Sequence, residues 1–212
     1  MNKDIYIVGA GTYGEVMCEL AEILEYDIKG FYDEDNSKFG LSIMGYSVLG
    51  KFSDLTNEQI LGNSYIVAIG NNAVRSKIMT NINYVGGKTP TLIHPTAVIS
   101  PSAEIGKGVY IQANACIWTK VKIDNFCIIS PNVVVAHHSN IGKACLISTL
   151  SAVGASINIE DKVFLGMGCT LVTGMHRVGE NSIIGAGAVV LKDVDKNSVC
   201  VGVPAKKIRD IS

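Results

Sequence analysis

The C-terminal part of the chain repeats with a strict period of six residues. A six-residue period predicts a solenoid in which three hexapeptides form one triangular coil of about eighteen residues. The larger aliphatic residue of each hexapeptide points inward, and a smaller residue two positions earlier fits near a corner. The inward series is Ile99, Ile105, Ile111, Ile117, Ile123, Ile129, Val135, Ile141, Ile147, Val153, Ile159, Leu165 and Leu171. The small series is Ala97, Ala103, Val109, Ala115, Val121, Cys127, Val133, Ser139, Cys145, Ser151, Ile157, Val163 and Cys169.

The inward series shifts once, by a single residue. After Leu171 the next inward aliphatic residue is Val178, seven positions later, and the six-residue steps then resume. One residue is therefore inserted within TGMHR, residues 173–177, and we expect it to bulge from the solenoid without breaking the core. His176 lies in this loop, which makes it a weaker candidate for a position near an acceptor or a cofactor.

The chain has six cysteines and no CxxC pair, so a zinc knuckle or a thioredoxin-type site is not indicated. Cys127 and Cys145 are eighteen residues apart, so they should lie one above the other. A redox or metal pair is one interpretation. Because both cysteines obey the small-residue series, we favour their role as small core residues in a reducing compartment.

Strand-like and helix-like patterns alternate before the repeats begin. The helical period of residues 15–25 places Val16, Leu20, Ile23 and Leu24 on one stripe. This alternation predicts a small parallel sheet with flanking helices, which together form an α/β Rossmann-like domain over residues 1–93. The hexapeptide repeats predict a parallel β-helix over residues 94–212. The other expected elements are strands at residues 5–8, 28–32 and 65–69 and a helix over residues 71–82.

A glycine-rich loop, GAGTYG, connects the first expected strand to the first expected helix. Gly9, Gly11 and Gly14 have the GxGxxG spacing in the context that a dinucleotide fingerprint requires. Glycines let the backbone approach a phosphate, and a helix N-terminus supplies amide donors. A tight turn that binds no ligand is the alternative interpretation.

Further polar residues are expected beside this loop. Asp33 and Glu34 end the next strand, about twenty residues on, where a ribose-binding carboxylate is expected. Gly70 and Asn71 end the strand in VAIGNN and should border the same crevice. The segment before the repeats has room for half of a two-lobed dinucleotide fold. A ligand of mononucleotide size therefore fits better than NAD.

Composition and charge narrow the possible partners. Hydrophobic residues make up 48% of the chain and charged residues 17%, which argues against disorder. The formal net charge of -1 gives no field that would attract nucleic acid or an anionic membrane. We find neither a membrane-spanning run nor a signal-peptide core, so a cytoplasmic protein is expected.

Several segments together resemble one protein family. They are GAGTYG, YIVAIGNNAVRSKI, LIHPTAVISPSA, the hexapeptide repeats and VGVPAKKI, which together span essentially the whole chain. They resemble bacterial nucleotide-aminosugar N-acetyltransferases and sialic acid O-acetyltransferases. The strongest similarity is to enzymes that acetylate the C4 amine of UDP-linked 4-amino-4,6-dideoxy sugars for surface glycans. The resemblance implies a left-handed β-helix, a homotrimer, and acetyl-CoA bound between adjacent subunits, with no metal.

The resemblance also implies a set of site residues. Contacts with the nucleotide-linked sugar would come from Thr12, Tyr13, Gly14, Asp33, Glu34 and Gly70, with Asn71 beside them. Contacts with acetyl-CoA would come from Leu146, Met167 and Gly185, largely through the backbone. Lys206, Lys207 and Arg209 could meet the CoA phosphates, although a solvated basic tail is an equal alternative.

The adjacent histidines in VVVAHHS align with the catalytic motif of the family, V-x-x-H-[DE]. The match makes His137 the expected general base, with direct attack of the sugar amine on the thioester. A histidine suits this role because the ordinary pKa of its side chain lies near neutral pH. Two departures stand out: His138 replaces the carboxylate that usually follows the base, and Leu146 replaces a histidine near acetyl-CoA. The resemblance thus implies His137 and His138 as the catalytic pair.

Three other functions remain open. Acetylation of a sialic acid hydroxyl is the main alternative within the enzyme class, and a non-catalytic binding solenoid is an alternative outside it. A solenoid carbonic anhydrase would need three histidines on zinc. The six-residue register places His137 and His138 in the turn between two faces of one coil. Because adjacent residues of a strand point to opposite sides, we do not expect them to share a metal.

Overall fold

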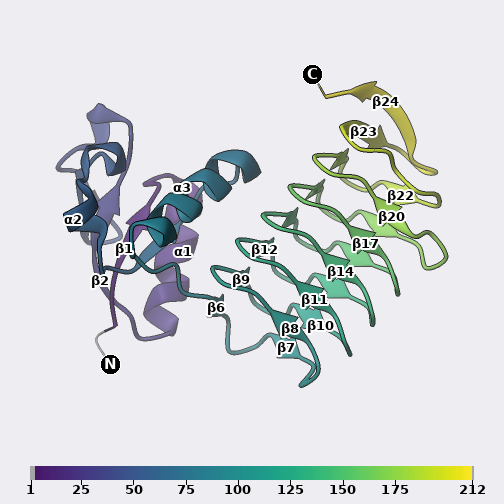
Figure 1. Cartoon of the computed structure of the whole chain (residues 1–212), viewed down its shortest axis with the longest axis horizontal. Coiled ribbons are helices and arrows are strands. Elements are labelled where there is room, and N and C mark those ends of the chain that lie inside the picture. Colours follow the sequence, from purple (N-terminus) through teal and green to yellow (C-terminus); the bar gives the residue numbers. More distant parts are fainter. Residues whose placement is uncertain (1–2, 212) are drawn as a thin grey trace. The chain divides into compact units, whose positions relative to one another are not determined.

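The computed structural model describes residues 3–211, which form two compact units that divide between Leu92 and Ile93 (Figure 1). Within the described residues, no helix combines the length and apolar character needed to span a membrane.

The first unit is an α/β domain around one five-stranded sheet, in the order β3-β4-β2-β1-β5. All neighbouring strands are parallel except β3 and β4, which form an antiparallel hairpin. The hairpin and the short helix α2 were not expected from the sequence. The elements are β1 (Asp4–Val8), α1 (Thr12–Ile23), β2 (Asp27–Tyr32), β3 (Ser42–Ile43), β4 (Tyr46–Gly50), α2 (Asn57–Ile60), β5 (Tyr65–Val67) and α3 (Asn72–Tyr84).

Helix α1 buries only part of its apolar stripe. Val16 and Ile23 are exposed, at 44% and 49% of their surface. Because small side chains let a helix lie close to a sheet, the face that packs inward is richer in small residues than the stripe of largest aliphatics. The buried residues of α1 are Gly14, Met17, Cys18, Leu20 and Ala21.

The second unit is the expected left-handed parallel β-helix, whose coils stack along the solenoid in Figure 1. We call its three sheets face 1, face 2 and face 3, in the order in which the chain visits them. Face 1 contains β6 (Leu92–Ile93), β9 (Tyr110–Ile111), β12 (Ile128–Ile129), β15 (Leu146–Ile147), β18 (Phe164–Leu165), β21 (Ile183–Ile184), β23 (Ser198–Val201) and β24 (Lys206–Asp210). Face 2 contains β7 (Val98–Ile99), β10 (Cys116–Ile117), β13 (Val134–Val135), β16 (Ala152–Val153), β19 (Thr170–Leu171) and β22 (Val189–Val190). Face 3 contains β8 (Glu104–Ile105), β11 (Lys122–Ile123), β14 (Asn140–Ile141), β17 (Asn158–Ile159) and β20 (Arg177–Val178).

The inward positions of the solenoid are those that the period predicts. The second residue of each two-residue strand packs in one continuous core, together with the small-residue series. Cys127 and Cys145 are fully buried, and their thiols donate to the carbonyls of Gly142 and Glu160. Burial raises the pKa of the Cys145 thiol well above its usual range. These two cysteines are therefore packing residues, as expected.

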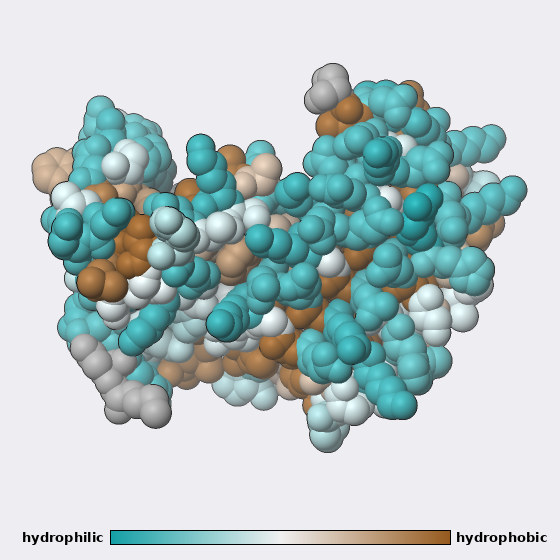
Figure 2. Space-filling view, viewed as in Figure 1, coloured by the Kyte–Doolittle hydropathy of each residue, from teal (hydrophilic) through white to brown (hydrophobic). Residues whose placement is uncertain are grey.

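The outward columns differ between faces. On face 2 the outward residues are small or apolar, whereas on face 3 they are polar or charged. In the space-filling view, hydrophobic and hydrophilic side chains gather in separate bands along the solenoid (Figure 2). The face 2 column is Val98, Cys116, Val134, Ala152, Thr170 and Val189, and the face 3 column is Glu104, Lys122, Asn140, Asn158 and Arg177.

The predicted insertion lies between β19 and β20. Arg177 pairs with Asn158, one residue beyond the regular spacing of eighteen. The side chain of Met175 is 3% exposed and packs in the core. The core is therefore continuous across the insertion.

Candidate active site

His137 and His138 form the corner between faces 2 and 3. The N–H of His138 donates to the carbonyl of Thr119 at 3.0 Å, and the carbonyl of His137 accepts from the N–H of Ser156 at 3.0 Å. These bonds anchor the corner to the coils before and after it. His138 has a φ of 61°, and Lys120 and Ser156 have nearly the same φ at the equivalent corner positions. The left-handed turn is thus a regular feature of this corner.

The two imidazoles meet, contrary to our expectation. The Nδ1 atoms of His137 and His138 are 3.1 Å apart, and the rings are perpendicular, with centroids 5.2 Å apart. The alternation of side chains holds along a strand. It does not apply here because both residues lie in a turn, where the left-handed residue swings its side chain toward its neighbour.

Trp118, one coil before the pair, was missed by sequence reasoning. Its ring stacks on His137 with centroids 6.4 Å apart and an interplanar angle of 29°. Its indole N–H donates to the sulfur of Cys116 at 3.1 Å. Trp118 is the only tryptophan of the chain and is 47% exposed, and its place at the same corner as His137 could have been read from the period.

The predicted acetyl-CoA residues lie elsewhere on the solenoid. Leu146 is an outward, half-buried residue of face 1. Met167, which is 58% exposed, and Gly185 both belong to the corner between faces 1 and 2, on successive coils. Lys206 begins β24 and is exposed. Within one chain these residues therefore do not share a corner with His137.

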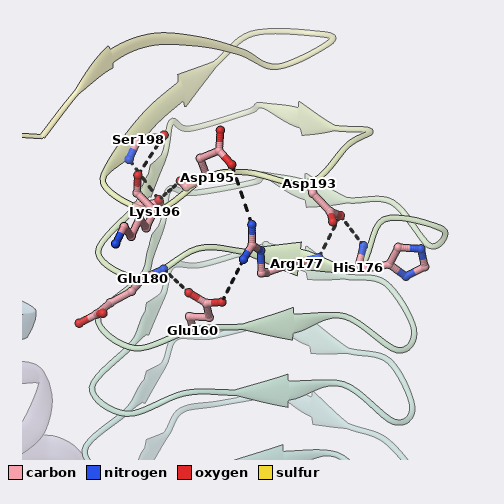
Figure 3. Close-up of polar contacts among 9 residues, drawn as sticks. Glu160, His176, Arg177, Glu180, Asp193, Asp195, Lys196 and Ser198 are labelled. Carbon is pink, nitrogen blue, oxygen red and sulfur yellow. Dashed lines mark hydrogen bonds and ion pairs between the residues drawn. The ribbon is translucent and has the colours of Figure 1, made fainter.

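The remaining histidines do not join the pair. His176 is held through its backbone, since the N–H groups of His176 and Arg177 donate to Asp193 at 2.6 and 3.0 Å (Figure 3). These bonds hold the pKa of Asp193 below its ordinary value. The ring of His94 contacts the hydroxyl of Thr96 at 2.9 Å, at a different corner. Across residues 3–211 no cluster of three or more metal-binding side chains is found.

The glycine loop of the first unit is a close-packed turn. Gly9 has a φ of 107°, and a Cβ atom there would lie 2.8 Å from the carbonyl oxygen of Ala68. A Cβ atom on Gly14 would lie 2.1 Å from the carbonyl oxygen of Gly9. Gly14 therefore serves helix–strand packing, whereas Thr12 is exposed at the start of α1 and Tyr13 is half-buried.

Asp33 is tied to this loop. Its carboxylate accepts hydrogen bonds from the N–H of Ala10 at 2.7 Å and of Asp35 at 2.9 Å, and pairs with Lys38 at 3.0 Å. Burial opposes its ionisation, but these contacts together hold its pKa below the ordinary value. Asp33 lines a cavity of about 450 Å³ together with Tyr32, Asp35, Asn36, Phe39, Leu49, Gly50, Lys51, Asp54, Leu55 and Gln59.

The other residues predicted to bind the nucleotide-linked sugar have hydrogen-bonding partners within the first unit. Glu34 accepts from the N–H and hydroxyl of Ser53 at 3.1 and 2.7 Å. Asn71 caps helix α3 by accepting from the N–H of Val74 at 3.0 Å. The buried guanidinium of Arg75 donates to the carbonyl of Gly70 at 3.3 Å, and thereby fixes the loop that follows β5.

Comparison with known proteins gives consistent matches over both units. Residues 4–82 match the PglD N-terminal domain, and residues 87–211 match the GMPPB C-terminal domain. The structure of PerB from Caulobacter crescentus, in complex with CoA and GDP-perosamine, is 30% identical, with 97% of each chain covered and a TM-score of 0.88. The acetyltransferase domain of PglB from Neisseria gonorrhoeae FA1090 is 31% identical, with 98% of this chain and 100% of that chain covered and a TM-score of 0.88.

Among curated relatives, the GDP-perosamine N-acetyltransferase of Escherichia coli O157:H7 is 29% identical over 85% of this chain and 82% of its own length. Other curated acetyltransferases match over shorter parts of the chain. This chain spans 28% of the length of one of them and 54% of the length of another.

The Rossmann-like unit and the hexapeptide β-helix, matched together along nearly the whole of two solved chains, define an acyltransferase of the hexapeptide-repeat class. Within that class, the chain belongs to the family of nucleotide-aminosugar N-acetyltransferases. Acetyl-CoA is the co-substrate of this enzyme family, as the sequence suggested.

Proposed function

We propose that this enzyme acetylates the C4 amine of a nucleotide-linked 4-amino-4,6-dideoxy sugar in the cytoplasm, with His137 as the general base. The observation that carries the proposal is the exposed imidazole of His137, on a corner anchored by backbone hydrogen bonds, in a chain that also holds a cavity of about 450 Å³ beside Asp33. The relatives named for GDP-perosamine support an amino sugar on a nucleoside diphosphate as acceptor. The sequence alone leaves the nucleotide base open among UDP, dTDP and GDP.

The chemistry requires one base and no covalent enzyme intermediate. The amine nitrogen attacks the thioester carbon, a C–N bond forms, and the carbonyl electron pair moves to oxygen. The Nε2 atom of His137 takes the proton that the nitrogen loses. Collapse of the intermediate breaks the C–S bond, and the imidazolium returns that proton to the leaving thiolate. A backbone N–H would stabilise the oxyanion, as acyl transfer generally requires.

The outward columns support a homotrimer. A contiguous apolar surface on a soluble protein marks an interaction site. Face 2 has such a surface, and face 3 does not. Three copies related by a three-fold axis form a closed ring of head-to-tail interfaces. We therefore propose that face 2 is turned toward the axis of a trimer.

This arrangement would also complete the active site. Face 2 is flanked by two corners, one carrying His137 and the other carrying Met167 and Gly185. In a ring with face 2 toward the axis, the first corner of one subunit meets the second corner of the next. His137 would then face acetyl-CoA bound to a neighbouring subunit, which explains why the predicted residues are separated within one chain.

The acceptor can be identified by mass spectrometry. We expect acetyl transfer from acetyl-CoA to at least one of the UDP-, dTDP- or GDP-linked 4-amino sugars. O-Acetylation of a free or CMP-linked sialic acid, with no transfer to these amines, would replace our proposal with the main alternative. Binding of neither CoA nor nucleotides in a thermal-shift screen would favour a non-catalytic solenoid.

The role of His137 can be tested by substitution. His137→Ala should lower kcat by about two to four orders of magnitude, because the amine loses its proton acceptor. Asn140→Ala, an exposed change on face 3 only three residues away, is the matched control and should leave kcat within about twofold of wild type, as expected for a surface substitution. Near-normal turnover of His137→Ala would show that no base is needed at this corner.

A further inference from the structure

We propose that His138 is a positioning residue for His137. In its neutral form it accepts a hydrogen bond at Nδ1 from the Nδ1–H of His137, and so leaves Nε2 of His137 free to accept the proton of the substrate. This inference rests on the proposed role of His137 as base. It assigns a purpose to the histidine that stands where similar enzymes carry a carboxylate.

The contact between the rings restricts their protonation. At 3.1 Å, one Nδ1 atom must donate and the other must accept. Two imidazolium rings would set one N–H against another, so this geometry holds at most one positive charge. A neutral imidazole has its proton on only one nitrogen, and the hydrogen bond at Nδ1 decides which. If His137 donates, its Nε2 is the basic atom, and His138 carries its own proton on Nε2.

The surroundings of His137 are compatible with that polarity. Trp118 covers one side of the His137 ring, His138 occupies its Nδ1 edge, and the ring is otherwise exposed. Among the described residues, no hydrogen bond is found at Nε2 of His137. The edge that remains open to a substrate is therefore the edge that the proposed hydrogen bond keeps unprotonated.

No described carboxylate can take the place of His138. The coil before the pair contributes Thr119 and Lys120 at this corner, and the coil after it contributes Ala155 and Ser156. The charged side chain among them, Lys120, is a donor without an acceptor atom. In the described part of the chain, the hydrogen-bonding partner found at Nδ1 of His137 is Nδ1 of His138.

Substitutions of His138 separate acceptors from donors. His138→Ala should lower kcat by about 10- to 100-fold, as is typical when an orienting partner of a histidine is lost. His138→Lys should be at least as impaired, because lysine cannot accept a hydrogen bond. His138→Glu should recover most of the lost rate. It should also move the acid limb of the kcat/KM profile to higher pH, because a carboxylate favours the protonated imidazole.

These variants are expected to fold. Equivalent left-handed corner positions are occupied by Lys120, Ala144 and Lys162, with φ values between 56° and 58°. The backbone at residue 138 therefore accommodates alanine and lysine side chains. Circular dichroism and the oligomeric state of each variant provide the check.

A second measurement does not depend on activity. Long-range 1H–15N correlation spectra of ring-labelled protein distinguish the two tautomers of a neutral histidine. We expect His137 to carry its proton on Nδ1 in the wild type, and to become predominantly Nε2–H or mixed in His138→Ala.

The outcomes distinguish the two proposals. Loss of activity in His137→Ala together with wild-type kcat, pH profile and tautomer in His138→Ala would overturn the positioning role and leave the proposed function intact. Loss in His138→Ala with near-normal turnover of His137→Ala would reverse the roles and overturn both assignments. Lysine performing as well as glutamate at position 138 would also overturn the proposal.

Discussion

Faces 2 and 3 are built from the same coils by the same hexapeptide rule, yet they present opposite surfaces. Their inward residues are both branched aliphatics, such as Ile117 on face 2 and Ile123 on face 3. Their outward neighbours are Cys116 and Lys122. The solenoid period therefore dictates what lies inside a coil, while the outward positions are free to encode partners. The contrast shows that, in each two-residue strand, the inward residue determines the fold, while the outward residue is free to determine how the surface associates.

The largest effect should follow from placing a charge on face 2. Ala152→Arg inserts a guanidinium into the apolar column, where an unpaired charge would be desolvated on assembly. We expect the proposed trimer to dissociate and activity to be lost. Asn158→Arg, six residues later on face 3, is the matched control and should retain both. Light scattering and turnover at fixed protein concentration test this difference. Equal behaviour of the two variants would remove the distinction between the faces.

An intermediate effect, equal on both faces, should follow from emptying an inward position. Ile117→Ala and Ile123→Ala should each reduce the free energy of unfolding by about 2–5 kcal/mol, through lost burial and a residual cavity. Both side chains are at most 2% exposed, so both costs should fall within this range. Denaturant titration at one protomer concentration provides the measurement. A much larger loss for Ile117→Ala would indicate that the core is not equivalent behind the two faces.

The smallest effect should come from the outward column of face 3. Lys122 and Glu104 form an ion pair of 3.0 Å between neighbouring coils, and both side chains are more than half exposed. Exposed pairs contribute about 0–1 kcal/mol. Lys122→Ala should therefore change the free energy of unfolding by less than about 1 kcal/mol, with an even smaller change at high salt. A loss of several kcal/mol in the same titration would mean that face 3 is not simply solvated.

The sequence predicted the solenoid almost completely because its core repeats. Every inward position follows from the register of Ile99, and the single insertion before Val178 was located to within the loop that contains it. The fold of the first unit was harder to predict. Its strands and long helices were expected, but the stripe of large aliphatics in α1 does not mark the buried face, because only part of it is buried. Close packing against β1 instead selected small residues such as Cys18 and Ala21.

The site was predicted in part for a related reason. A motif can name His137, but the contact with His138 and the stacking of Trp118 arise from corner geometry and from the spacing between coils. Both depend on the three-dimensional path of the turn, which strand alternation does not describe. Likewise, the hydrogen bond from Ala10 to Asp33 joins the ends of two strands and leaves no local signature in the sequence.

Strand β24 has a consequence for how such solenoids avoid growing into fibres. It runs antiparallel to β23 at the end of the face 1 sheet, and each residue of its sequence KKIRD is exposed. A parallel stack of coils would otherwise end in an open edge that another copy could extend indefinitely. Reversing the direction of the last strand and loading it with charge makes that edge a poor template. Strand β24 therefore limits the extension of the face 1 sheet by another copy, in addition to the limit set by the number of repeats.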